Sequence, residues 1–438
     1  MPVVGCAVTA VAADELARAT GLAACDTVAR ALGDLDHPHY GGLARGSVVI
    51  VDEASTLGHR DLDRLVAHVE AAGGALVLIG DPHQHGPVGP GHFFGWLVAH
   101  KGADVPTLRA NHRQADVVDD EGNVVVSLAP EREANIAFRE GRIAEALALR
   151  DDAGLVTRAA SVPELYDAVV GEWLADWQGG ARDPMVTTRN AVRHELNRRA
   201  RDLLAEAGEV SGPAMEVAGR SFQVGDYVVA GANNRRLRST SDPGWWVKNG
   251  SRGTVAVVDA EAGRLSVDFE GAGGGVHRVV MPARYLGAGH LDWAYAVTDY
   301  GVQGRTLERS RSVVDDTTTS AGAYVATTRG RLENRIYLVD GTVADERDVE
   351  ASHGAPSQRE SSFDALAARL AAERPDGLLH DADPTVAEGG ALAARFTLGE
   401  LEALLAPVAA TVAAAPPDVA RRIAGADAAY ETLAARHR

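Results

Sequence analysis

The sequence predicts an α/β protein built from parallel sheets that are covered by helices on both faces. Between Val3 and about Ala110, short continuous apolar runs alternate with amphipathic helical stretches, the pattern of strands buried on both sides. The alternation resumes near Asn135, and short segments of alternating polarity interrupt it between Arg220 and about Leu286. We therefore expect two parallel-sheet domains, a small antiparallel β-barrel inserted into the second, and an Ala-rich helical tail.

These changes of pattern divide the chain into six predicted segments. The polar stretch after Asp340 indicates a linker, and the Ala-rich region that follows indicates helices. The predicted ranges are 1–110 for the first parallel-sheet domain, 111–219 and 291–345 for the two parts of the second, 220–290 for the barrel, 346–362 for the linker and 363–438 for the tail.

The composition limits the possible partners. The 438 residues carry a net charge of −18, which argues against a protein that coats nucleic acid by bulk electrostatics but leaves room for a local channel. Only Lys101 and Lys248 are lysines, so phosphate chemistry that needs a lysine has few candidates. No apolar run is long enough to span a membrane and no signal peptide is evident, so we expect a cytoplasmic protein without a membrane partner.

Two adjacent carboxylates follow an apolar run that predicts a buried strand. The run Val48–Val51 is followed by Asp52 and Glu53, at the strand end where open α/β sheets bind ligands. Nucleotide hydrolysis needs one carboxylate near Mg²⁺ and another to orient water, so Asp52 is the predicted metal ligand and Glu53 the predicted group for the water. An isolated acidic pair of this kind is more often a solvated turn.

A second polar loop follows the next predicted strand. Leu76–Ile79 leads into Gly80, Asp81, Pro82, His83 and Gln84, and a turn-rich stretch follows. An amide at the end of a neighbouring strand can sense a γ-phosphate or its attacking water. Gln84 is therefore a predicted catalytic residue and Asp81 a predicted nucleotide contact.

Together, DEAS at 52–55 and GDPHQHGPVGPG at 80–91 resemble motifs II and III of superfamily-one helicases of the RecD-like branch, including the helicase region of conjugative relaxases. The resemblance implies two RecA-like domains, ATP with Mg²⁺ as cofactors, and single-stranded DNA as partner. Further segments resemble family motifs in family order over roughly residues 3–340. Thr9 lies in a segment similar to motif Ia, which touches DNA, and Arg113 in one similar to motif IV, which implies a γ-phosphate contact.

The later motifs supply the remaining candidates. Thr298, Gln303, Gly304 and Arg305 lie in a segment similar to motif V; the resemblance implies nucleotide contacts for Gln303 and Gly304 and DNA contacts for the other two. Arg329 lies in a segment similar to motif VI, where a fixed guanidinium can stabilise a transferred phosphoryl group.

Three further observations concern the choice and the role of these candidates. Arg331 is the second choice for the motif VI arginine. Asp299–Val302 departs from the motif V pattern, where a histidine and a basic residue are common, so that a DNA contact at Arg305 becomes more important. Trp245, in a predicted barrel loop, can stack on single-stranded bases or pack inside the barrel.

The family's first motif, G-x-x-x-x-G-K-[ST], is absent from these 438 residues. In the family this loop precedes motif Ia, so we expect it upstream of Met1 and regard the first domain as N-terminally truncated. The leading interpretation is the motor region of a 5′-to-3′ DNA helicase whose nucleotide site is incomplete in this chain. Two alternatives are a non-catalytic DNA- or protein-binding remnant and a subunit that completes its site with a separate N-terminal polypeptide.

Overall fold

The computed structural model of the chain describes residues 2–88, 91–108, 111, 113–118, 124–271, 274–340 and 362–373. The chain divides into two compact units. We call the one that contains residues 1–112 the first unit, and the one formed by residues 113–373 the second unit.

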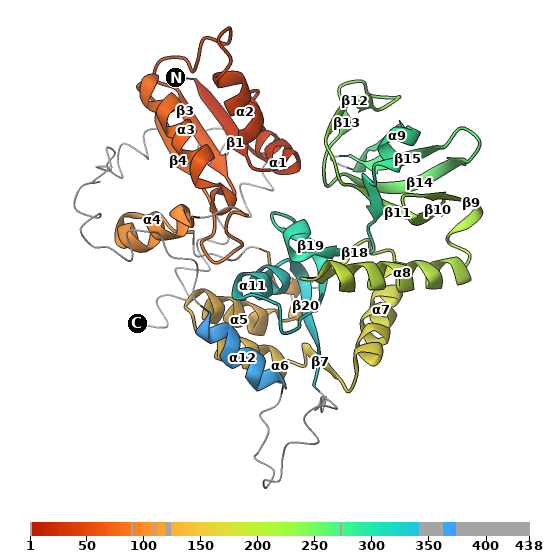
Figure 1. The fold of residues 1–438 in the computed structure, drawn as a ribbon. Helices are drawn as coiled ribbons and strands as arrows, with labels where there is room; N and C mark the ends of the chain where they lie inside the picture. Colours follow the sequence, from red (N-terminus) through yellow and green to blue (C-terminus); the bar gives the residue numbers. More distant parts are fainter. Residues whose placement is uncertain are drawn as a thin grey trace, which may run out of the picture. The chain divides into compact units, whose positions relative to one another are not determined.

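The first unit is built on a parallel sheet in the strand order β2-β1-β3-β4 (Figure 1). In β3, Val49 and Val51 pack on one face while Val48 and Ile50 pack on the other, and all four are buried. The continuous apolar run therefore reflects burial on both faces, as predicted. The strands are β1 (Val3–Ala7), β2 (Cys25–Thr27), β3 (Val48–Asp52) and β4 (Ala75–Leu78).

Amphipathic helices supply the two covering layers of this sheet. Leu32 of α2 and Leu65 of α3 are fully buried in one cluster with Val49 and Val51. On the other face, Leu16 of α1 packs close to Gly5. The helical elements are α1 (Ala10–Thr20), α2 (Val28–Leu35), η1 (Ala54–Thr56), α3 (His59–Ala71), α4 (Phe93–Lys101) and η2 (Gly102–Asp104).

The second unit contains a five-stranded sheet in the order β18-β8-β19-β20-β7, and all its neighbouring strands are parallel. The predicted α/β class with two parallel sheets is thus confirmed. The strands are β7 (Val156–Ala159), β8 (Met185–Thr187), β18 (Ala296–Thr298), β19 (Leu307–Val313) and β20 (Gly330–Val339). A short antiparallel pair, β5 (Val117–Val118) and β6 (Val124–Val126), precedes them.

Helices again cover both faces of this sheet. Trp173 of α7 and Leu196 of α8 pack in one core cluster, and Leu147 of α6 and Tyr324 of α11 pack in another. The helices are α5 (Ala129–Arg139), α6 (Ile143–Asp152), α7 (Val162–Gln178), α8 (Asn190–Glu206), α10 (Asp299–Val302), α11 (Ser320–Thr328) and α12 (Ser362–Ala372).

An antiparallel module interrupts the second unit between α8 and β18. Its main sheet has the order β16-β15-β14-β11-β17, and two-stranded pairs β9–β10 and β12–β13 accompany it. The antiparallel insertion matches the prediction, but closure into a barrel is not confirmed, because β16 and β17 are edge strands of the main sheet. The elements are β9 (Ser211–Val217), β10 (Arg220–Val224), β11 (Tyr227–Ala230), β12 (Asn234–Arg238), β13 (Trp246–Val247), β14 (Arg252–Asp259), β15 (Arg264–Glu270), β16 (Val276–Met281), α9 (Ala283–Gly287) and β17 (Leu291–Trp293).

Most of the predicted linker and tail lies outside the described residues, which resume only at α12. Phe363, Leu366 and Leu370 of this helix are buried in the same cluster as α6 and α11. The start of the predicted tail is therefore part of the core of the second unit. Among the residues described, no helix combines the length and apolar character that a membrane crossing requires.

Gly5 is the position in the first sheet where a side chain has least room. A Cβ at Gly5 would overlap Cys25 Sγ and lie 3.1 Å from Leu16 Cδ2, because β1 and β2 pair directly at this point. We expect Gly5→Ala to lower the free energy of unfolding by about 1–3 kcal/mol, the usual cost of overpacking. Urea denaturation measures this change.

Gly33 provides the matched control for Gly5→Ala. Gly33 lies inside α2, and a Cβ there would meet no atom within 4 Å. Gly33→Ala should stabilise the protein by up to about 1 kcal/mol, because alanine is the better helix former. Cys25→Ala should recover part of the loss caused by Gly5→Ala; an unchanged loss would show that the two side chains do not collide.

Candidate functional site

The first group of predicted residues lies where β3 and β4 end. Val51 pairs with Leu78 in the parallel ladder, and the Ala54 N–H donates to the Ile79 carbonyl at 2.8 Å. The segments that follow the two strands, with Asp52 and Glu53 in one and Asp81 and Gln84 in the other, therefore start side by side. Asp52 is half-buried, and its Oδ1 accepts a 2.9 Å hydrogen bond from the Glu53 N–H.

Glu53 adopts a backbone conformation that side chains usually avoid. Its φ of 52° and ψ of 39° lie in the left-handed region, at the point where β3 gives way to η1. Left-handed geometry costs roughly 1–2 kcal/mol for a residue with a Cβ. Such strain at the end of a sheet strand is typical of functional sites, where it aims a side chain that a glycine could not supply.

Two buried polar atoms beside these carboxylates lack a hydrogen-bond partner in the part of the chain that the structure describes. They are Ser55 Oγ, in the residue after Ala54, and Gln84 Oε1. The amide nitrogen of Gln84 is engaged, since Nε2 donates to Asp81 Oδ2 at 3.4 Å. A buried polar atom without a partner is costly, so both are suited to contact a bound ligand.

The same residues fit a magnesium ion better than a transition metal. Among described residues, no group of three or more His, Cys, Asp and Glu side chains could hold a metal ion. Magnesium in nucleotide sites is held by one or two carboxylates together with phosphate oxygens and water. Asp52 can supply the protein carboxylate that such a site needs.

The strain at Glu53 can be tested with two truncations at the same position. Glu53→Gly and Glu53→Ala both remove the carboxylate, so their difference isolates the backbone. We expect the glycine variant to be more stable than the alanine variant by about 1 kcal/mol, the reverse of the usual order, because only glycine is free of strain at positive φ. Thermal unfolding of the pair measures this, and alanine equal to or better than glycine would contradict it.

In the second unit, the two predicted phosphate-contacting arginines meet at one turn. Arg113 donates from Nη1 to the Thr328 carbonyl at 2.8 Å and from Nε to Thr306 Oγ1 at 3.2 Å. Arg329 follows Thr328 at the end of α11 and donates from Nη2 to Thr328 Oγ1 at 3.2 Å. The segments predicted as motifs IV, V and VI are thus joined by hydrogen bonds.

Arg329 does not project from the surface of the second unit. It is only 2% exposed, and its Nε donates to the Val325 carbonyl at 3.3 Å, so the guanidinium satisfies the end of α11. The phosphate contact predicted for Arg329 would require this side chain to leave its present position. Arg331, the second choice, is exposed and forms a 2.9 Å ion pair with Glu308.

The predicted motif V residues lie directly before β19. Gln303 Nε2 is buried and unpartnered among the described residues, and Gly304 has a φ of 76°, which favours glycine. The Leu307 N–H donates to the Arg329 carbonyl at 2.9 Å, which ties this segment to the turn after α11. The structure therefore brings Gln303 and Gly304 toward the same end of the sheet as Arg113 and Arg329.

A buried polar network, missed by the sequence analysis, supports this turn. Arg150 of α6 donates to Glu131 Oε2 and Asn135 Oδ1, both at 2.6 Å, and to the Thr327 carbonyl at 3.0 Å. Glu131 also accepts from the Asn334 N–H at 2.7 Å. Burial lowers the pKa of Arg150, and the charge of Glu131 opposes that shift.

Gln114 extends this network on the other side of the turn. Its Nε2 donates to the Gly330 carbonyl at 2.7 Å, and its Oε1 accepts from Asn135 Nδ2 at 3.0 Å. Side chains from three separated parts of the chain thus fix the backbone on both sides of Arg329. The sequence signal was weak, because these polar residues stand singly in a loop, in helices and in a strand, with no motif that links them.

The ion pair in this network gives a stability prediction. Arg150→Met leaves the buried Glu131 carboxylate uncompensated, and we expect a loss of about 3–5 kcal/mol in unfolding free energy. Adding Glu131→Gln, which removes the stranded charge, should restore part of it. The control is Arg198→Met, at a 53% exposed arginine paired with Glu195, where a change within about 1 kcal/mol is expected. Chemical denaturation that gave equal losses for both arginines would contradict the assignment.

The predicted nucleic-acid residues are more scattered. Thr9 is the N-cap of α1, with its hydroxyl accepting from the Ala12 N–H at 3.2 Å, and Thr298 precedes α10 at the end of β18. Arg305 is half-buried before β19. Trp245 stacks on His277, with ring centroids 4.7 Å apart and planes 9° apart, which favours the packing role over base stacking.

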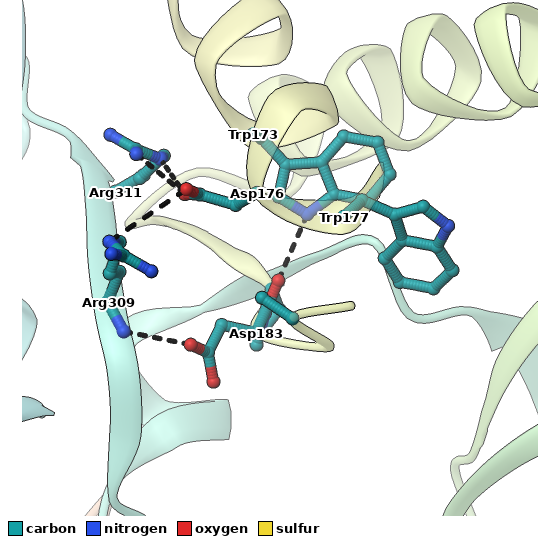
Figure 2. Close-up of a pocket in the computed structure, with 8 residues that line it drawn as sticks. Trp173, Asp176, Trp177, Asp183, Arg309 and Arg311 are labelled. Atoms are coloured by element: carbon teal, nitrogen blue, oxygen red, sulfur yellow. Dashed lines mark hydrogen bonds and ion pairs between the residues drawn. The ribbon is translucent and has the colours of Figure 1, made fainter. Parts of the chain in front are cut away.

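A small pocket in the second unit is lined by none of the predicted site residues. It is lined by residues of α7, by residues just before β8, and by Arg309 and Arg311 of β19 (Figure 2). Asp176 forms a 2.6 Å ion pair with Arg311, and Trp173 Nε1 donates to the Asp183 carbonyl at 3.0 Å. Burial raises the pKa of Asp183, whose carboxylate accepts from the Glu308 and Arg309 N–H groups. Its polar groups are paired with one another, so the pocket needs no ligand to satisfy them.

Comparisons with known proteins agree with these motifs. Residues 1–161 match the AAA_30 family model, an AAA domain. The chain is 27% identical over 307 residues to a probable conjugal transfer protein TraA of Sinorhizobium fredii, covering 66% of this chain and 24% of that protein. It therefore spans about a quarter of the length of this relative. An uncharacterized protein of Mycobacterium tuberculosis is 33% identical over 140 residues, covering 32% of this chain and 75% of that protein.

Solved structures with a similar arrangement include two Pif1 helicases. A Bacteroides Pif1 bound to single-stranded DNA has 16% identity and a TM-score of 0.44, covering 77% of this chain and 82% of that one. Pif1 from Candida albicans has 16% identity and a TM-score of 0.44, covering 77% and 84%. The family model, the curated relatives and the order of the motifs show that the chain is similar to superfamily-one helicases of the RecD-like branch, including the helicase region of conjugative relaxases.

Proposed function

We propose that this chain is the motor region of an ATP-dependent, 5′-to-3′ cytoplasmic DNA helicase of the relaxase or RecD type. The observation that supports this most directly is the side-by-side start of the segments holding Asp52 with Glu53 and Asp81 with Gln84, at the ends of β3 and β4. Open parallel sheets bind ligands at this edge. The unpartnered Ser55 Oγ and Gln84 Oε1 give it free hydrogen-bonding capacity.

Each candidate site residue of the first unit has a role in this proposal. ATP, when bound with Mg²⁺, supplies the phosphoryl group whose transfer to water releases energy for movement. Asp52 holds the metal ion, Glu53 orients the water or accepts its proton, and Gln84 contacts the γ-phosphate region. Asp81 positions the Gln84 amide through their hydrogen bond.

The second unit contributes contacts from the turn after α11. Arg113 and Arg329 serve the γ-phosphate, and Gln303 with Gly304 contacts the nucleotide. Arg113 is already fixed by Thr306 and Thr328, whereas Arg329 must leave the end of α11 to reach a phosphate. The planar guanidinium suits bidentate phosphate recognition.

The phosphate-cradling part of the site is not among these residues. Lys101 ends α4, and Lys248 lies 5.2 Å from the ring of Trp246, so neither occupies a loop of the form G-x-x-x-x-G-K-[ST]. Each charge-assisted hydrogen bond from such a loop contributes about 1.5–3 kcal/mol. We propose that a segment outside these 438 residues, or a separate N-terminal polypeptide, supplies the loop.

A second candidate function is a non-catalytic DNA- or protein-binding remnant. The inward position of Arg329 favours it, because a guanidinium that is 2% exposed and bonded to its own helix does not need a nucleotide to be satisfied. In the helicase function and in a DNA-binding remnant, the proposed DNA contacts are the same. Thr9, Thr298 and Arg305 would contact the phosphate backbone of single-stranded DNA.

DNA-stimulated ATP turnover distinguishes these functions. We expect the 438-residue chain to show no more turnover than its Glu53→Gln variant, because the triphosphate is poorly held. A longer polypeptide with a strand and a G-x-x-x-x-G-K-[ST] loop before Val3 should hydrolyse ATP, lose turnover with Glu53→Gln, and unwind 5′-tailed duplexes faster than 3′-tailed ones.

Two outcomes would change the proposal. Robust turnover by the 438-residue chain that Glu53→Gln abolishes would contradict the incomplete nucleotide site. A folded, loop-containing polypeptide that hydrolyses no ATP would favour the non-catalytic function.

A further inference from the structure

The helix α12 packs on the outside of three other helices of the second unit. Phe363, Leu366 and Leu370 are buried in one cluster with residues of α5, α6 and α11, and Figure 1 shows α12 in blue beside α5 and α6. The opposite side of α12, with Asp364 and Ala368, is exposed. An isolated helix of 11 residues is marginal in water, so α12 depends on this docking for its helical structure.

Polar side chains near the end of α12 hold the start of α11. Arg369 Nη2 donates to the Thr318 carbonyl at 2.8 Å and to the Asp315 carbonyl at 3.2 Å, both in the turn before α11. Glu373 Oε2 accepts a 2.6 Å hydrogen bond from the N–H of Ser320, the first residue of α11. The first N–H groups of a helix need partners from outside it, and a carboxylate there also complements the helix dipole. Glu373 therefore caps α11.

The three helices under α12 also meet at the turn that carries Arg329. In each of them, a residue of the cluster shared with α12 lies about one helical turn from a residue of the buried network around this turn. The pairs are Phe138 and Asn135 in α5, Leu147 and Arg150 in α6, and Tyr324 and Thr327 in α11. The packing of α12 is thus only one helical turn away from the hydrogen bonds that hold the backbone beside Arg329.

We propose that residues 362–373 form a detachable strap that fixes the Arg329 turn from outside. While the strap is docked, Arg369 and Glu373 hold the start of α11, and the apolar side of α12 packs α5, α6 and α11 together. When α12 unfolds from this surface, the three helices lose a common contact and the turn loosens. The inference rests on the proposed function only for the role of Arg329 as a phosphate contact; the strap itself needs no nucleotide.

Hydrogen exchange of the 438-residue chain, followed by mass spectrometry, tests the strap. The double variant Arg369→Gln/Glu373→Gln weakens the polar contacts with the start of α11 and leaves every buried apolar side chain in place. We expect the amides of residues 320–330 to exchange about tenfold faster. The decisive amide is that of Gly330, which donates to Asn334 Oδ1 at 2.7 Å, because loss of a helix cap alone would fray only the start of α11.

The matched control for this double variant is Glu195→Gln/Arg198→Gln, which removes the same two charges from an ion pair on α8. Exchange over residues 320–330 should then stay equal to that of the unmodified chain. Equal acceleration by the two double variants would overturn the proposal. Faster exchange limited to the first turn of α11 would also overturn it, because Arg369 and Glu373 would then act only locally.

Leu370→Ala tests the apolar part of the strap, because the Leu370 side chain is completely buried in the cluster with α6 and α11. We expect the amides of α12 to lose their protection and the Gly330 amide to exchange about tenfold faster. The control is Leu204→Ala in α8, at a leucine that is 1% exposed in a different core cluster. It should destabilise the unit without accelerating Gly330 more than the rest of the sheet. Full protection of Gly330 after α12 has lost its own protection would contradict the strap.

These measurements are independent of ATP turnover. An unchanged Gly330 amide in both α12 variants would overturn the strap and leave the motor proposal intact. Conversely, a loop-containing polypeptide without ATP turnover would contradict the motor proposal and leave the exchange result standing.

Discussion

Parallel strand pairing is the constraint on which the first unit's candidate site depends. β3 and β4 run in the same direction, and their pairing extends from Val48 with Ala75 to Val51 with Leu78. The segments that follow the two strands must therefore leave the sheet at the same edge. The Ala54 N–H to Ile79 carbonyl bond extends that pairing beyond the strands. Gly80 permits the approach, since a Cβ there would lie only 3.0 Å from the Ser55 nitrogen. A small residue and a backbone bond thus hold the starts of the acidic segment and of the Gln84 segment side by side.

The second unit meets a different constraint, because the arginine predicted to contact phosphate, Arg329, lies at the end of the buried helix α11. The carbonyls at the end of α11 need donors, and Arg113, Arg150 and Gln114 all supply them around Thr327, Thr328 and Gly330. The backbone there is therefore held by several independent parts of the chain. Arg329 itself makes weaker, longer bonds to Val325 and Thr328. The backbone of this turn is thus held in place independently of the Arg329 side chain.

Sequence reasoning predicted the two parallel sheets well because the strands are buried on both faces and carry continuous apolar runs. It also placed Asp52 and Gln84 at strand ends, since that inference needs only strand direction. It could not predict where Arg329 points, because a long side chain has many rotamers and the competing carbonyls belong to its own helix. The sequence analysis did not predict the Glu131–Arg150 pair for another reason. The contacts of this pair with Asn334 and Thr327 depend on tertiary packing between distant segments.

Trp245 and Trp246 also show that the sequence does not predict where a side chain points. Adjacent positions at the start of a strand face opposite sides, and two identical residues give no sign of which side is buried. The structure stacks Trp245 on His277 and leaves Trp246 beside Arg235 and Lys248. At physiological salt, charges beyond about 8 Å are largely screened, so the net charge of −18 does not by itself prevent an anion from binding at a local group of cations.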